Sequence, residues 1–163
     1  MESDLVQTWR MSCEANRFLL ENIPDPALGA SYAPRTRSVA RQFAHLHDVR
    51  LRWLSAAAPA LAKGLEPLPK QGELSKKVLL SALVASREAM ASLLEQSAAS
   101  GKVKSWNGPP ATFLGYVVAH EAHHRALAIV ALRAAGFKLP EEVVYGLWDW
   151  GKRSSRRVKS GEG

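Results

Sequence analysis

The segment from Val117 to Val130, VVAHEAHHRALAIV, concentrates side chains that bind metal ions and transfer protons. His120 and His124 lie four positions apart, which on a helix separates them by about 40° around the axis and about 6 Å along it. Both imidazoles can therefore face one ion. They belong to an apolar stripe with helical spacing that also contains Phe113, Val117, Leu127 and Ala131. Because two neutral imidazoles inside a core are costly without a partner, this stripe predicts a divalent metal ion.

A second group of histidines supplies the candidates for a third ligand. The chain has five histidines, and His45 and His47 lie together in another helical pattern. Positions two apart on a helix differ by about 200°, so these two side chains cannot bind the same ion. Periodicity slightly favours His47, but His45 also has apolar neighbours, and the pattern leaves both open. His123 is about 100° from His124, and we expect it near the metal or at the surface.

The letters from His120 to His124 also form H-E-x-x-H, the signature of zinc proteases in which the glutamate is the general base. The wider context of such a protease is missing. No further histidine follows to extend the motif, and no strand pattern is available to hold an extended peptide substrate. We therefore interpret Glu121 as a polar helix residue near the site, and we exclude a zincin-type protease.

The elements that must position these residues are all predicted to be helices, separated by proline and glycine. The apolar periodicity predicts long helices at about 3–24, 36–57, 73–100 and 110–135, and a short one within 139–152. The segment PALAKGLEPLPKQG contains three prolines and two glycines, which predicts a crossover connection or at most a broken helix. The fold class is therefore all-α, a four-helix bundle with a long crossover and a short C-terminal helix.

Length and composition describe one ordinary globular domain. The chain has 163 residues, 47% of them hydrophobic, and we assign a single domain to 1–151 and a basic, disordered tail to 152–163. Much of the net charge of +7 comes from that tail, so nucleic-acid binding is not expected. No apolar run could span a membrane and no signal peptide is recognisable, which predicts a cytoplasmic protein. The single cysteine, Cys13, lies in an apolar helical pattern and is expected to be a buried thiol.

The chain resembles the DinB-like superfamily of small metal-binding four-helix bundles over nearly its whole length. The resemblance rests on TWRMSCEANRFLLENI, RSVARQFAHLHDVRLRWL and FLGYVVAHEAHHRALAIVALRAAGFKLP. In the second segment, Val39 lies six positions before His45 and Asp48 three positions after it, as in the family pattern. In the third segment, Arg125 directly follows His124, which also matches the family pattern. The resemblance implies that His45, His120 and His124 form a three-histidine site for a divalent metal. Zinc or nickel is expected in preference to iron or copper.

The resemblance also implies a choice of functions. Some members of the superfamily are thiol-dependent transferases or isomerases that bind a low-molecular-weight thiol, and others are proposed hydrolases. We therefore expect a metalloenzyme that carries out thiol-dependent transfer or hydrolysis of a small molecule, as a homodimer. The alternative is a non-catalytic stress-response or interaction bundle in which the metal is structural.

Overall fold

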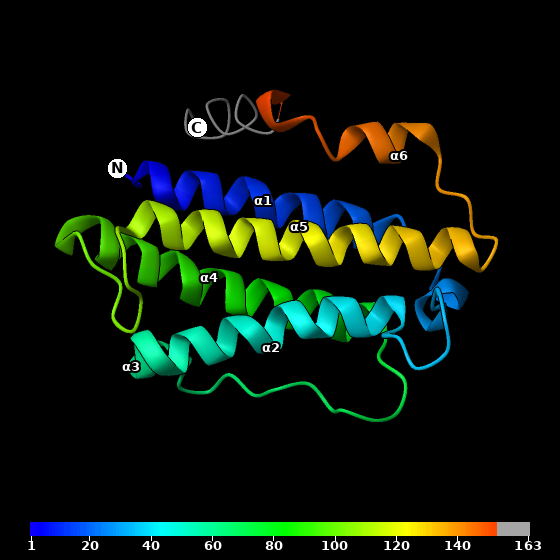
Figure 1. Cartoon of the computed structure of the whole chain (residues 1–163), viewed down its shortest axis with the longest axis horizontal. Helices are drawn as coiled ribbons and strands as arrows, with labels where there is room; N and C mark the ends of the chain where they lie inside the picture. Colours follow the sequence, from blue (N-terminus) through cyan, green and yellow to red (C-terminus); the bar gives the residue numbers. More distant parts are fainter. Residues whose placement is uncertain (153–163) are drawn as a thin grey trace, which may run out of the picture.

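The computed structural model describes residues 1–152. They form four long helices and three short helical segments, joined by connecting segments (Figure 1). In chain order they are α1 (Asp4–Glu21), η1 (Asp25–Gly29), α2 (Val39–Ala57), α3 (Pro59–Ala62), α4 (Lys76–Ser100), α5 (Pro110–Ala134) and α6 (Glu141–Gly146). These residues contain no strand, which confirms the all-α prediction. None of their helices combines the length and apolar character needed to cross a bilayer. The predicted basic tail lies, from residue 153 on, outside the described residues.

Local signals in the sequence explain where the helices begin and end. The Ser38 hydroxyl accepts a hydrogen bond from the Arg41 backbone N–H, and the Ser75 hydroxyl accepts one from the Val78 N–H. Each serine is an N-cap, so α2 and α4 each begin three residues later than the periodicity predicted. Gly101 ends α4 in the left-handed region, with φ of 69°, where a side chain would be strained.

The connection between α2 and α4 sets the topology of the bundle. After α3, residues 63–75 run back along α2 without regular structure, so α4 begins at the end of the bundle where α2 began (Figure 1). As a result α2 and α4 run in the same direction, and α1 and α5 run in the opposite one. This arrangement confirms the predicted four-helix bundle with a long crossover.

The interior consists of two apolar clusters separated by a polar layer. One cluster contains Leu19, Phe43, Leu79 and Ala128, and the other contains Trp9, Leu54, Met90 and Phe113. Each of the four long helices contributes to both clusters. Between them along the four helices lie the buried polar residues Asn16, Arg50, Ser86, Glu121 and His124. The predicted metal ligands lie at the level of this polar layer, between α2 and α5.

Candidate metal centre

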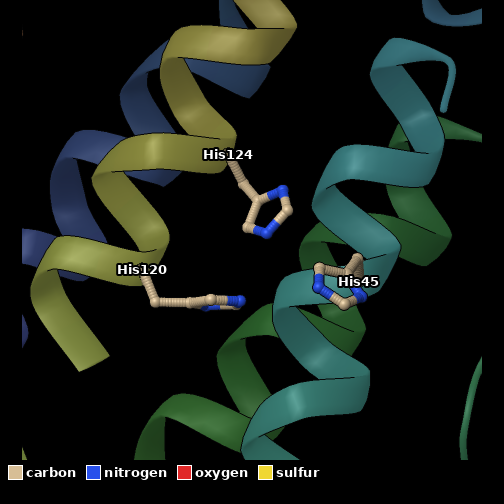
Figure 2. A group of neighbouring side chains, drawn as sticks. All are labelled: His45, His120 and His124. Atoms are coloured by element: carbon tan, nitrogen blue, oxygen red, sulfur yellow. The ribbon is translucent and has the colours of Figure 1, made fainter. Parts of the chain in front are cut away.

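His45 of α2 and His120 and His124 of α5 converge on one point between the two helices (Figure 2). One ring nitrogen from each residue lies within 4.8 Å of the other two. The ring centroids are 4.4 Å apart for His45 and His124, and 4.5 Å apart for His120 and His124. Helical spacing alone brings the α5 pair together, and the antiparallel packing of α2 against α5 adds the third ring.

This geometry fits a divalent ion. Nitrogen ligands around zinc have bonds of about 2.0–2.1 Å, so in a tetrahedral site they lie about 3.3 Å from one another. Small rotations of the side chains bring nitrogens that are at most 4.8 Å apart to that spacing. His124 is buried, with 6% of its surface exposed, whereas His45 and His120 are only partly buried. In this three-histidine group, which we call the metal cup, His124 is covered by the core, whereas His45 and His120 remain partly accessible to solvent.

The surroundings keep the imidazoles neutral, the state in which they bind metals. Burial, followed by the neighbouring His45 and His120, lowers the pKa of His124 to about 3. Burial, then the positive charge of Arg37, lowers the pKa of His45 to about 4. Burial also lowers the pKa of His120 below its ordinary value. Near neutral pH all three rings offer a lone pair, and no proton has to be displaced when a metal binds.

A hydrogen bond to Gln42 determines which nitrogen of His124 is available. The Nδ1 atom of His124 is 2.7 Å from the Oε1 atom of Gln42, and both side chains are buried. Since the amide oxygen can only accept, Nδ1 carries the proton and Nε2 keeps its lone pair. A partner of this kind fixes the ring orientation and the tautomer of a metal-binding histidine. Gln42 had not been identified from the sequence, although it lies on α2 one turn before His45.

The three-histidine group includes neither His47 nor His123. His47 is 2% exposed, and its two ring nitrogens lie 3.0 Å from the Ala82 carbonyl oxygen and 2.9 Å from the Glu66 carbonyl oxygen. It therefore ties α2 to α4 and to the crossover, on the other side of α2 from His45. His123 is exposed, and its ring contacts that of His124 at a centroid distance of 5.1 Å. Only His45 is placed to complete a set with the α5 pair.

Glu121 belongs to a buried ion pair. Its carboxylate accepts hydrogen bonds from Arg50 Nε at 2.7 Å, from Arg50 Nη2 at 2.9 Å and from Asn16 Nδ2 at 2.6 Å. Glu121 and Arg50 are each 1% exposed. The carboxylate of Glu121 is therefore engaged by three donors, from α1 and α2, inside the bundle. The glutamate of the H-E-x-x-H motif thus forms a buried ion pair with Arg50, which differs from the role of this glutamate as general base in a zincin.

The ion pair extends into a network that joins all four long helices. Arg50 Nη1 donates to the Leu83 carbonyl oxygen at 2.9 Å, and Arg125 Nη1 donates to Asn16 Oδ1 at 2.6 Å. Burial by itself would lower the pKa of Arg50, but the adjacent Glu121 carboxylate outweighs it, and the net pKa is raised. The neighbouring Cys13 is buried, which confirms the sequence prediction of a buried thiol, and burial raises the pKa of that thiol.

Comparison with known proteins identifies the family. A family model described as the DinB family matches residues 1–150. The crystal structure of a DinB-like protein from Bacillus cereus ATCC 10987 superimposes with a TM-score of 0.62 at 22% sequence identity, covering 83% of this chain and 93% of that chain. At that identity the likeness concerns the fold alone. No curated protein sequence matches the chain. Because the family model spans nearly all of the described residues, the chain belongs to the DinB family.

Proposed function

We propose that the protein is a metalloenzyme that binds one divalent metal ion through His45, His120 and His124. The observation that carries the proposal is the convergence of three imidazole nitrogens within 4.8 Å, from two helices, with His124 buried and His45 and His120 only partly buried. Structural metal sites are usually closed by four protein ligands, whereas reactive sites keep a position open for water or substrate. Three neutral ligands and an open side favour the reactive kind of site.

When bound, the ion would act as a Lewis acid. Because its three imidazole ligands are neutral, it would keep its full charge of +2 and could activate a water or a thiol near neutral pH. The protein residues have three tasks. Gln42 orients the ring of His124, the half-buried His45 and His120 define the open side, and the buried polar layer closes the opposite side. We propose thiol-dependent transfer or hydrolysis of a small substrate as the reaction, supported by the open coordination side and by membership of the DinB family.

The interior of the bundle argues against a purely structural metal. Two apolar clusters and the buried Arg50–Glu121 pair already connect α1, α2, α4 and α5. The proposed ligands connect only α2 and α5, which the ion pair also joins. A metal that merely braced the fold would duplicate an existing connection. We therefore expect the protein without metal to stay folded.

Metal content is the direct test. The purified chain should contain about one equivalent of divalent metal, and His45→Ala, His120→Ala and His124→Ala should each reduce it to a small fraction. His123→Ala is the matched control, because it removes an exposed histidine from the same turn of α5. Stoichiometric metal in all four variants, measured by atomic emission, would refute the proposed ligands.

A cobalt-substituted protein separates a reactive site from a closed one. Addition of β-mercaptoethanol should produce a thiolate-to-cobalt charge-transfer band if a coordination position is open to thiols. An unchanged spectrum at saturating thiol would contradict thiol-dependent transfer and leave hydrolysis as the reaction to be tested.

A further inference from the structure

An aromatic platform lies beside the metal cup. It consists of Trp53 at the C-terminal end of α2, Trp106 in the loop between α4 and α5, and Tyr116 of α5. The ring centroids are 5.7 Å apart for Trp53 and Trp106, 5.3 Å for Trp106 and Tyr116, and 5.7 Å for Trp53 and Tyr116. Tyr116 is 41% exposed, and both tryptophans are partly exposed. A single exposed aromatic side chain needs no explanation, but three adjacent rings that reach the surface together indicate a binding surface.

The platform is held rigidly from below and from the side. Phe113 is fully buried and contacts Trp53 and Trp106 at centroid distances of 5.2 and 5.5 Å. The Trp106 indole N–H donates to Thr112 Oγ1 at 3.1 Å, which satisfies its polar group within the chain. Ser105, next to it, has φ of 66° and donates from its hydroxyl to the Ala56 carbonyl oxygen at 3.2 Å. A non-glycine residue held in the left-handed region indicates that the surroundings impose this loop conformation.

Tyr116 connects the platform to the metal cup. Tyr116 precedes His120 by one helical turn, and their rings are stacked, with centroids 6.2 Å apart and an interplanar angle of 27°. One turn of helix rises about 6 Å, which is about the length of a benzene ring with one substituent atom. A small molecule with a donor atom at the metal can therefore lay a flat group across Tyr116 toward the tryptophans.

We propose that this platform binds a planar, apolar group of the substrate, such as an aromatic ring, while a donor atom of the same molecule reaches the three histidines. The assignment rests on the proposed metal site and deepens it by naming a substrate class. Aromatic rings recognise flat apolar groups by stacking and edge contacts, and a rigid platform does so with little loss of entropy. A cation would be a poor occupant, since the exposed Arg37 and Arg52 lie near enough to affect His45 and His120.

Two metal-binding probes that differ only in the flat group test this assignment. Benzohydroxamate and acetohydroxamate bind an open metal position through the same pair of oxygens, but only the first carries a ring. Their dissociation constants should be measured on the cobalt-loaded full chain by optical titration. We expect benzohydroxamate to bind at least about tenfold more tightly, because its ring adds both buried apolar area and an aromatic contact.

Variants locate the origin of that preference. Trp53→Ala and Trp106→Ala should bring the ratio of the two dissociation constants toward one and leave acetohydroxamate binding unchanged. Tyr116→Leu is a second variant at a more exposed position, in case a tryptophan variant does not fold. Trp148→Ala is the matched control, since Trp148 is 80% exposed and follows α6, and it should keep the ratio of the unmodified chain.

The outcomes separate the two proposals. If neither hydroxamate binds the cobalt-loaded chain, the open metal site itself is refuted. If both bind with equal affinity, or if the preference persists in all three platform variants, the metal site stands and the platform assignment is overturned. Gel filtration adds one more decisive outcome. A platform buried between two copies of the chain would give variants that change from dimer to monomer with an unchanged ratio, and this too would overturn the assignment.

Discussion

Replacement of Glu121 by glutamine should destabilise the protein severely, for reasons unrelated to metal chemistry. The side chain keeps its size but loses its charge, and one of its two oxygens becomes an N–H group that faces Arg50 and Asn16. Both oxygens now accept hydrogen bonds, at 2.7 Å from Arg50 Nε and at 2.9 and 2.6 Å from Arg50 Nη2 and Asn16 Nδ2. Glu121→Gln would leave Arg50 as an uncompensated charge that is 1% exposed.

The magnitude follows from the burial of the pair. Removing one partner of a buried ion pair costs about 3–5 kcal/mol, because the remaining charge stays desolvated. For a domain of this size, about 1 kcal/mol corresponds to a shift of about 2–4 °C in Tm, so Glu121→Gln should lower Tm by about 6–20 °C. Urea denaturation of the metal-free protein, followed by circular dichroism, measures the free energy of unfolding directly.

A double variant makes the reasoning refutable. Arg50→Met removes the other charge, so the double variant with Glu121→Gln should be more stable than Glu121→Gln alone. A loss below about 1 kcal/mol for Glu121→Gln, or a double variant that is less stable still, would show that the pair is not the buried connection described above. An unchanged stability with complete loss of hydrolytic activity would instead support Glu121 as a general base, as in the zincins.

Three further predictions concern the metal cup. Gln42→Leu should weaken metal binding by about 10–100-fold, because it removes the acceptor for His124 Nδ1, whereas Gln42→Glu should retain tight binding; competition with a chromogenic chelator measures both. The metal-free protein should lose stability steadily as the pH falls from about 6.5 to about 3, since the unfolded chain takes up protons on these histidines before the folded chain does. The folded pKa values of about 4 for His45 and about 3 for His124 set the lower end of that window, and the double variant His45→Ala, His124→Ala should flatten the profile. Dialysis against a chelator should remove the metal and leave the far-ultraviolet circular dichroism spectrum unchanged, whereas loss of the helical signal would favour a structural metal.

The helices could be predicted from sequence because their signals are local. Prolines and glycines separate the apolar stripes, and the crossover has too many of them to continue a helix. The predicted start of the second helix near Thr36 was wrong, since Ser38 caps α2 and the helix begins at Val39. The hydroxyl of Ser38, directly before the apolar stripe of this helix, indicated the correct start, but the prediction followed the periodicity instead.

The choice between His45 and His47 shows what helical periodicity measures. The pattern favoured His47 because periodicity reports burial, and His47 is indeed the more buried of the two. The ring nitrogens of His47 contact carbonyl oxygens of α4 and of the crossover. These contacts join residues far apart in the chain, so the helical periodicity of α2 cannot reveal them. The resemblance to the DinB-like superfamily favoured His45, and the structure places His45 beside His120 and His124. His45 is only partly buried within this group, so burial alone could not show which of the two histidines lies beside the α5 pair.

Arg50 carried a signal that the sequence analysis did not use. It lies four positions after Leu46 and four before Leu54, on the apolar stripe of α2. An arginine at a core position requires a buried counter-charge. Glu121 is a candidate for that counter-charge, because it lies inside a predicted helix, directly after His120. The two anomalies, a buried charge on α2 and a buried charge on α5, explain each other once the two helices are known to pack together.

The same pairing explains why one segment of α5 contains the letters of a protease motif but arranges its glutamate differently from the histidines. His120 and His124 are about 40° apart on the helix and face α2 at the open side, whereas Glu121 is about 100° from His120 and points into the bundle. Its bond to Arg50 fixes the rotation of α5 about its axis relative to α2. That rotation decides whether the two α5 histidines face His45. The glutamate of HEAHH therefore contributes to the metal cup by orienting the helix that carries it, and a protein with a weakened Arg50–Glu121 pair should bind metal less tightly even while it remains folded.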